Sequence, residues 1–222
     1  MDIYLGFDPG GKKKFGWAVC ESTGQTLHVL ATGTGKAGHT EEAVTAALSK
    51  IPKAGNVIGV GIDAPLFWVE NGERTVDKLV RDEITKLKAP YPWGTVQKIN
   101  SLRGSCLVQG VLLANRLHQD YLEIAITESH PKALIYLLKI KMTEKKPGLV
   151  LNTKALATCL DYNEEWGKWK DNKEHERDAI LGAVTAFARH EKRKEWKNIL
   201  EDEQNVPVVP FKYKPEYWMP LP

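Results

Sequence analysis

Four acidic residues lie at the ends of predicted structural elements, where they can act together. Asp8, Asp63 and Glu128 each follow an apolar segment with the pattern of a β-strand, and Asp178 lies in a long helical pattern near the end of the chain. In an open α/β sheet, functional side chains gather outside the strand ends where the strand order changes. Carboxylate oxygens are preferred ligands of Mg²⁺ and Mn²⁺, and two such cations can promote phosphodiester cleavage. The four acids therefore predict a carboxylate site for Mg²⁺ or Mn²⁺.

The surroundings of Asp8 raise the question of what balances its charge. The segment GFDPGGKKKFGW places this carboxylate at the tip of an apolar strand, directly before two glycines and three lysines. Removing a carboxylate from water is costly unless a positive group meets it. One source of that charge is the set Lys12, Lys13 and Lys14, and the other is a bound metal ion. In the second case the three lysines are left to bind an anionic substrate.

Two residues share a helix face with Asp178, because they precede it by three and four positions. We predict that His175 transfers a proton or orients a ligand, and that Glu174 is a further metal ligand. The alternative for Glu174 is a simple favourable interaction of its charge with the positive amino end of the helix.

Three arginines are candidate substrate-binding residues. Arg74 and Arg81 occur at helical spacing in GERTVDKLVR, and Arg103 lies in SLRGSC at the start of another helical pattern. Guanidinium groups at helix starts suit the binding of phosphates. An ion-paired, solvated helix face is the alternative for Arg74 and Arg81, and an ordinary helix cap is the alternative for Arg103.

The hydrophobic patterns predict an α/β fold that can position these residues. Five strands are expected, the first three as an antiparallel meander, over residues 3–7, 15–20, 27–32, 57–62 and 122–127. Helices are expected over residues 40–51, 73–88, 101–119, 132–138, 153–160 and 174–196. We predict a single domain over residues 1–222, with a helical insertion at about 65–120 and an extended C-terminal tail at about 205–222.

Composition limits the class of protein. The 222 residues are 42% hydrophobic and 27% charged, with a formal net charge of +3, which permits a nucleic-acid partner without requiring one. The three cysteines are far apart and show no CxxC spacing, which argues against a disulfide framework and a cysteine zinc site. No segment has the roughly 20 apolar residues of a membrane helix. We therefore expect a cytoplasmic protein without a membrane partner, and we leave its oligomeric state open, a homodimer included.

Four segments carry a resemblance to a known family. GFDPGGKKKFGWAV, GIDAPL, TESHP and HERDAILGAVTAFA resemble, in this order, the motifs of domain of unknown function 429, a family of predicted nucleases with a ribonuclease H-like fold. The first strand with its aspartate, and the pattern of His175, Asp178 and Ala179, also resemble the RuvC resolvase branch of that fold. The resemblance covers residues 3–189.

This resemblance implies a five-stranded mixed sheet flanked by helices, with a helical insertion between strands four and five. It also implies a two-metal site in which Asp8, Asp63 and Asp178 bind Mg²⁺ or Mn²⁺ and Glu128 or Glu174 completes the ligand set. The expected activity is that of a metal-dependent nuclease acting on DNA or RNA. The alternatives are a nucleotide-binding enzyme of the actin-like and sugar-kinase class, and an inactive nucleic-acid-binding module of the same fold.

Overall fold

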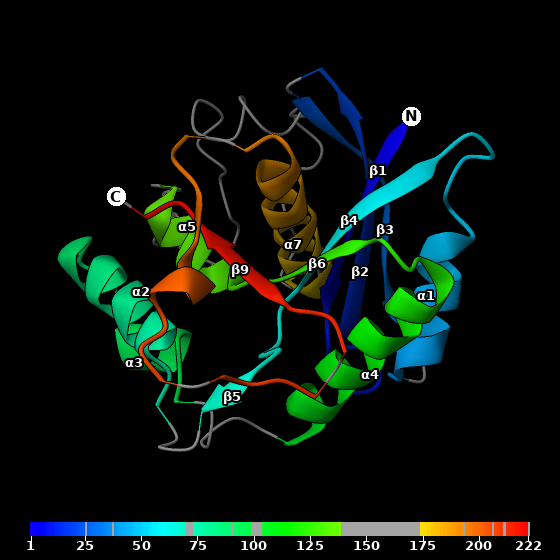
Figure 1. The fold of residues 1–222 in the computed structure, drawn as a ribbon. Helices are drawn as coiled ribbons and strands as arrows, with labels where there is room; N and C mark the ends of the chain where they lie inside the picture. The colour runs from blue at the N-terminus through cyan, green and yellow to red at the C-terminus, as the bar shows by residue number, and fades with distance from the viewer. Residues whose placement is uncertain are drawn as a thin grey trace, which may run out of the picture.

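The computed structural model describes most of the chain and shows a mixed α/β fold (Figure 1). The described residues are 1–24, 26–36, 38–69, 73–89, 91–98, 104–138, 174–192, 194–205, 207–210 and 212–221. The main sheet contains β1 (Asp2–Asp8), β2 (Phe15–Thr23), β3 (Thr26–Gly35), β4 (Asn56–Ile62), β6 (Ala125–Glu128), β7 (Lys197–Asn198) and β9 (Glu216–Met219). The helices are α1 (Thr40–Leu48), α2 (Thr75–Lys86), α3 (Pro92–Thr95), α4 (Gly104–Asp120), α5 (Pro131–Leu137) and α7 (Glu174–His190), followed by the short 3₁₀-helix η3 (Ile199–Asp202).

The main sheet has seven strands in the order β3-β2-β1-β4-β6-β9-β7, so the prediction of five strands was wrong. The two additional strands come from the C-terminal part of the chain. β9 pairs in parallel with β6, and β7 pairs antiparallel with β9. A sheet that ended at β6 would expose unpaired backbone groups, and β9 satisfies them.

The strand directions bring three strand ends together at one edge of the sheet. β1, β2 and β3 form the predicted antiparallel meander, whereas β4 runs parallel to β1 and β6 runs parallel to β4. In this register Phe7 pairs with Ile62, which in turn pairs with Glu128. The residues at the carboxyl ends of β1, β4 and β6 are therefore neighbours across the sheet.

Helices cover both faces of the sheet, so the fold has two hydrophobic cores (Figure 1). Side chains alternate along β1: Tyr4 packs in the core that includes α7, whereas Ile3, Leu5 and Phe7 pack in the core with α1 and α4. This alternation is the expected consequence of the twofold period of a strand.

Helix α7 lies unusually close to the sheet because small residues line the contact. A Cβ atom on Gly6 of β1 would lie 1.6 Å from the Ala179 carbonyl oxygen, and one on Gly61 of β4 would lie 1.9 Å from the Gly182 carbonyl oxygen. Any side chain at these glycines would push the helix away. Because these glycines have no side chain, α7 can lie directly on the strands. This close contact sets the distance between Asp178 on the helix and the strand ends.

The segment between β4 and β6 contains α2, α3 and α4, as well as β5 (Trp68–Val69), which pairs with β8 (Pro207–Val208) in a second sheet. The structure thus confirms helices at the predicted segments 73–88 (α2) and 101–119 (α4). It adds α3 and β5, which were not predicted. Some helices are shorter than expected: α1 ends at Leu48, and α7 ends at His190, before a turn in which Lys192 has a φ of 46°. The helix predicted for residues 153–160 lies outside the described residues. None of the described helices is long and apolar enough to span a membrane.

Candidate metal centre

Asp8 lies at the carboxyl end of β1 and is largely buried. Burial raises the pKa of Asp8, although a hydrogen bond and the charges of His175 and Lys132 act in the opposite direction. His175 Nδ1 lies 2.5 Å from Asp8 Oδ2. The neighbouring lysines do not provide this partner: Lys12, Lys13 and Lys14 are described and exposed, and none forms an ion pair with Asp8. In the structure the partner of Asp8 is His175 of α7 and not these lysines.

Asp63 is the first residue after β4, and its backbone N–H donates to the Phe7 carbonyl oxygen at 2.8 Å. This bond continues the pairing of β4 with β1 and holds Asp63 beside Asp8. The pKa of Asp63 is raised well above its ordinary value, first by burial and then by the charges of Asp8 and Asp178. Among the described residues, none makes a hydrogen bond or an ion pair to the Asp63 carboxylate.

Asp178 lies in the first turns of α7, and its side chain is buried. Arg177 contacts the same carboxylate oxygen twice, through Nε at 2.7 Å and Nη2 at 2.6 Å. Burial raises the pKa of Asp178 to about 6, with Asp8 adding to the shift and Arg177 opposing it.

The three aspartates thus come from β1, from the residue after β4 and from α7, and lie close enough that Asp8 and Asp178 raise the pKa of Asp63 and Asp8 raises the pKa of Asp178. Side chains that repel one another in a buried site are stabilised by a shared cation. In the part of the chain that the structure describes, no three His, Cys, Asp or Glu side chains are gathered around a common point as a bound metal requires. Asp8 is turned toward His175 and Asp178 toward Arg177. The carboxylate donors fit Mg²⁺ or Mn²⁺, provided that these two side chains exchange their protein partners for the cation.

Sequence reasoning missed two cations of this cluster, Lys132 and Arg177. Lys132, at the start of α5, forms an ion pair of 3.2 Å with Glu174 and lowers the pKa of Asp63. A lysine in the first turn of a helix is disfavoured by the helix dipole, and this misplacement was the available signal. The contact of Arg177 with Asp178 could not be predicted in this way, because adjacent residues do not face each other on a helix. Only the long side chain of Arg177 allows the contact.

Glu128 lies at the end of β6 and is fully buried; its charge raises the pKa of Asp63, but its carboxylate is bound by Arg74. Arg74 contacts Glu128 through Nη1 to Oε2 at 2.8 Å and Nη2 to Oε1 at 2.6 Å. Arg74 also contacts Asp77 through Nε at 2.8 Å and Nη2 at 2.6 Å. The backbone N–H of Leu66 donates to Glu128 Oε2 at 2.9 Å. Burial raises the pKa of Glu128, and Arg74 opposes that shift.

The two predicted substrate-binding arginines that the structure describes are buried and bonded within the protein. Arg74 and Arg81 are buried, and Arg81 donates to the Val96 carbonyl oxygen at 3.1 Å and to Glu73 at 2.5 Å. Neither guanidinium faces solvent as the solvated-face alternative required, and neither is presented to a phosphate. Arg103 lies outside the described residues.

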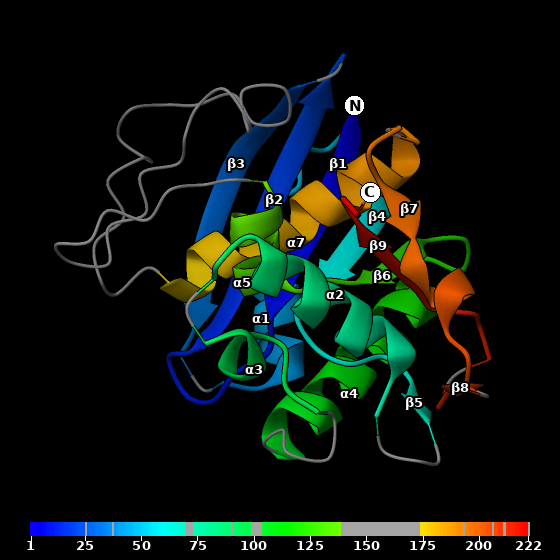
Figure 2. The same cartoon turned by 90° about the vertical axis from the view of Figure 1, so that its left-hand side faces the viewer.

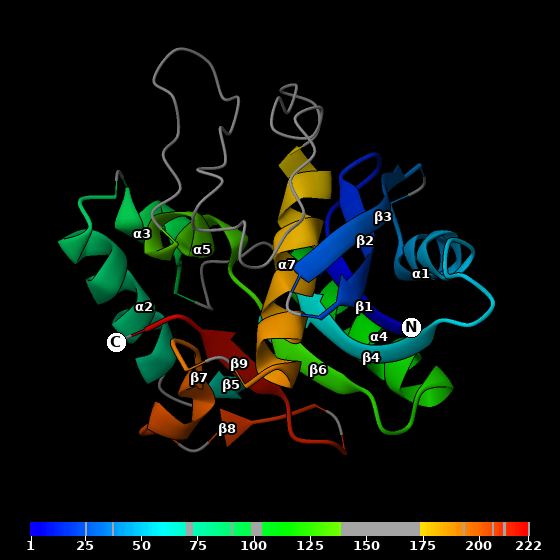
Figure 3. The same ribbon diagram turned by 90° about the horizontal axis from the view of Figure 1, so that it is seen from above.

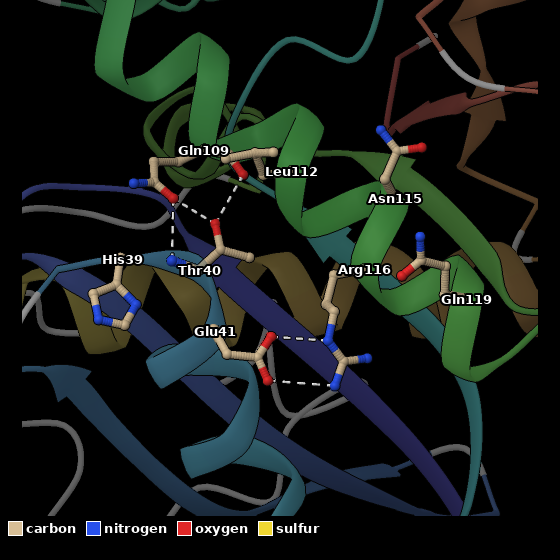
Figure 4. A pocket seen from close by; sticks show the side chains of 8 residues that line it. All are labelled: His39, Thr40, Glu41, Gln109, Leu112, Asn115, Arg116 and Gln119. Atoms are coloured by element: carbon tan, nitrogen blue, oxygen red, sulfur yellow. Dashed lines mark hydrogen bonds and ion pairs between the residues drawn. The ribbon is translucent and has the colours of Figure 1, made fainter.

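A groove at the contact of α1 and α4 lies apart from the acidic cluster (Figure 4). Gln109 accepts a hydrogen bond from the Thr40 backbone N–H at 3.1 Å, and Arg116 Nε donates to Glu41 at 2.9 Å. These bonds join the two helices across the groove. None of the predicted site residues lines it.

Comparison with known proteins places the chain in a family. No curated protein and no solved structure matches it. The family described as "Protein of unknown function (DUF429)" matches residues 6–195, which contain the last three residues of β1, all of β4, β6 and α7, and the acidic residues discussed above. Because the match covers most of the chain, this protein is a member of that family.

Proposed function

We propose that the protein is a Mg²⁺- or Mn²⁺-dependent nuclease with a ribonuclease H-like fold. The observation that carries this proposal is the convergence of Asp8, Asp63 and Asp178 from three separate elements into one cluster. Buried carboxylates without enough cationic partners destabilise a fold, so a cluster of this kind is typical of a site that binds a cation.

The fold supports the proposal at a coarser level. The resemblance to ribonuclease H-like proteins implies a mixed sheet flanked by helices, and the observed mixed sheet fits this expectation except that it has seven strands in place of five. The family match covers this arrangement, but its description assigns no activity. The acidic cluster therefore carries more of the argument than the fold.

In the proposed mechanism, Asp8, Asp63 and Asp178 hold the divalent cations. When bound, such cations supply an activated water and stabilise the negative charge that develops on phosphate oxygens. The exposed turn that contains Lys12, Lys13 and Lys14 follows Asp8 directly and offers positive charge to the phosphates of a nucleic acid.

We assign proton transfer to His175, whose Nδ1 lies 2.5 Å from Asp8 Oδ2. A hydrogen bond to Asp8 raises the pKa of His175, with burial acting against the shift. While bonded to Asp8, the imidazole therefore holds a proton more readily than a free histidine, and it can give this proton to a leaving oxygen once Asp8 has turned to the cation. Glu174 takes no part in metal binding in this proposal, because it pairs with Lys132. Glu128 is likewise left to Arg74.

The test is a cleavage assay on labelled DNA and RNA, both single- and double-stranded, with Mn²⁺, Mg²⁺ or EDTA. We expect metal-dependent cleavage of at least one substrate by the wild-type protein and its loss in Asp63→Asn. Asp82→Asn is the matched control, because Asp82 is an exposed aspartate on α2. Cleavage that persists in Asp63→Asn would contradict the proposal.

A nucleic-acid binding measurement and a thermal melt, made beside the cleavage assay, separate the alternatives. Binding of a nucleic acid without cleavage on any substrate would indicate an inactive binding module. A rise in melting temperature with ATP, in the absence of any polynucleotide, would favour the actin-like and sugar-kinase class.

A further inference from the structure

Two aromatic rings project from a rigid turn in the insertion. Tyr91 is 84% exposed and Trp93, in α3, is 62% exposed. The Tyr91 carbonyl oxygen accepts hydrogen bonds from the backbone N–H groups of Gly94 at 2.9 Å and Thr95 at 3.0 Å, and from the Thr95 hydroxyl at 3.2 Å. These bonds fix the turn that carries both rings.

The backbone at Tyr91 is strained, which indicates that its position is specifically maintained. Its φ of 55° and ψ of 54° lie in the left-handed region, where a bulky side chain is uncommon. Such conformations persist only where the surrounding structure fixes them, and they are frequent at ligand-binding sites. Here the strain holds an aromatic ring in solvent, where it contributes little to folding.

Trp93 is supported from below by the protein itself. The Arg81 guanidinium carbon lies 4.3 Å from the centre of the Trp93 ring. Arg81 is in turn held by the Val96 carbonyl oxygen and by Glu73. Because the guanidinium covers part of the ring while most of Trp93 stays exposed, the indole is held in a fixed position and remains accessible.

A positive group lies beside the exposed ring. Lys98 Nζ is 5.8 Å from the centre of Trp93 and 3.1 Å from Glu73 Oε2, and the Lys98 side chain is about half exposed. A flat aromatic surface next to an ammonium group matches a nucleotide, in which a flat base lies next to a phosphate.

The turn that carries Tyr91 and Trp93 lies on the same side of the molecule as the amino end of α7. α3 packs on α2, α2 packs on α5, and α5 packs on α7. Figures 2 and 3 show α3 beside α5, on the side toward which the first residues of α7 point. Asp178 and His175 lie in those first residues of α7. A strand bound at the acidic cluster can therefore extend along this side toward Trp93.

We infer that Tyr91 and Trp93 form a stacking platform for unpaired bases of a nucleic-acid strand, with Lys98 next to its phosphate. This inference rests on the proposed function and adds that the substrate is single-stranded where it crosses α3. Each base that stacks on an aromatic side chain gains affinity without requiring a particular sequence. The platform therefore gives affinity for strands with exposed bases, whatever their sequence.

The test compares a labelled oligothymidylate with an abasic strand of equal length, by fluorescence anisotropy. Ca²⁺ replaces Mg²⁺ to disfavour cleavage, and a gel checks that the strand stays intact. We expect Trp93→Ala to weaken binding of oligothymidylate about tenfold and to leave binding of the abasic strand unchanged. Trp93→Phe keeps an aromatic ring and is expected to retain most of the affinity.

Leu122→Ala is the control for a change in exposed apolar surface, because Leu122 is 76% exposed and lies between α4 and β6. We expect it to bind both strands like the wild type. Equal binding of the two strands by the wild type, an equal loss on both strands in Trp93→Ala, or no detectable binding of either strand would overturn the platform. These results would leave the proposed metal centre intact, because Mn²⁺ binding and Mn²⁺-dependent cleavage test it separately. A platform that binds bases in a protein without metal-dependent cleavage would overturn only the nuclease proposal.

Discussion

The protein contains two buried clusters of carboxylates that differ in how their charges are balanced. Around Arg74, all five N–H groups of one guanidinium are used: four bonds go to Glu128 and Asp77, and one goes to the Phe67 carbonyl oxygen at 3.3 Å. At the strand ends, Asp8 has His175 and Asp178 has Arg177, whereas Asp63 has no described partner. The first cluster is complete within the protein. In the second, Arg177, Lys132 and His175 lie near the aspartates, but no described residue bonds to the Asp63 carboxylate.

The number of donors around each buried carboxylate distinguishes a structural acidic residue from a candidate functional one. A buried carboxylate with a full set of donors stabilises a specific arrangement of the chain, and Glu128 does so by tying β6 to α2 and to the backbone of Leu66. A carboxylate whose pKa is raised by other carboxylates is kept in the fold at a cost in stability.

Replacing Arg74 should have the largest effect on stability. Arg74→Leu leaves Glu128 and Asp77 buried without a cation, and we expect a loss of about 3–5 kcal/mol in the free energy of unfolding. Urea denaturation measures this loss. A change below about 1 kcal/mol would show that the guanidinium is not the centre of this cluster.

The acidic cluster should make the metal-free protein less stable as the pH rises. The pKa of Asp178 is about 6 in the folded protein, above its ordinary value of 3.8, so the folded state binds more protons between these values. The contribution of Asp178 to stability is therefore present below about pH 4 and is lost by about pH 6, with a total change of up to about 3 kcal/mol. Urea denaturation across this pH range, in EDTA, measures the slope. Asp178→Asn should flatten the slope, and an equal slope in the variant would assign it to other groups.

Removing the unpartnered carboxylate should stabilise the metal-free protein. Asp63→Asn keeps the size of the side chain but removes the charge that repels Asp8 and Asp178. We expect a gain of about 1–2 kcal/mol in the free energy of unfolding near neutral pH, measured in EDTA. A loss of stability would mean that the Asp63 charge is balanced within the fold, as at Glu128.

An exposed ion pair gives the lower limit of the comparison. Lys78 and Asp82 lie one turn apart on α2, with 3.1 Å between Nζ and Oδ2, and both side chains are more than half exposed. Lys78→Ala should change the free energy of unfolding by less than about 0.5 kcal/mol, because solvent screens the pair. A larger change in urea denaturation would indicate that α2 is stabilised by its surface charges.

Much of the scaffold follows from the sequence, because its signals are local. Alternating or continuous apolar residues bounded by turns predict β1, β2, β3 and β4, and each of these strands begins and ends within about three residues of the expected positions. The placement of Asp8 and Asp63 at one edge follows from the parallel pairing of β1 with β4.

The remaining features depend on contacts between residues that are distant in the chain. The role of Glu128 is set by Arg74, which lies 54 positions away, and no local pattern distinguishes its carboxylate from that of Asp63. The strand β9 shows alternating burial over Glu216–Met219, but its four residues are too few to predict that it joins β6. Lys132 meets the acidic cluster only because α5 packs on α7.

The most direct test of the central claim is a calorimetric titration with Mn²⁺. The wild-type protein is compared with Asp8→Asn, Asp63→Asn, Asp178→Asn and the surface control Asp82→Asn. If Asp8, Asp63 and Asp178 together hold the cation, the wild type and Asp82→Asn bind Mn²⁺ alike, and each of the other three variants binds at least about tenfold more weakly. Mn²⁺ binding of equal strength in all five proteins, or no binding by the wild type, would contradict the claim.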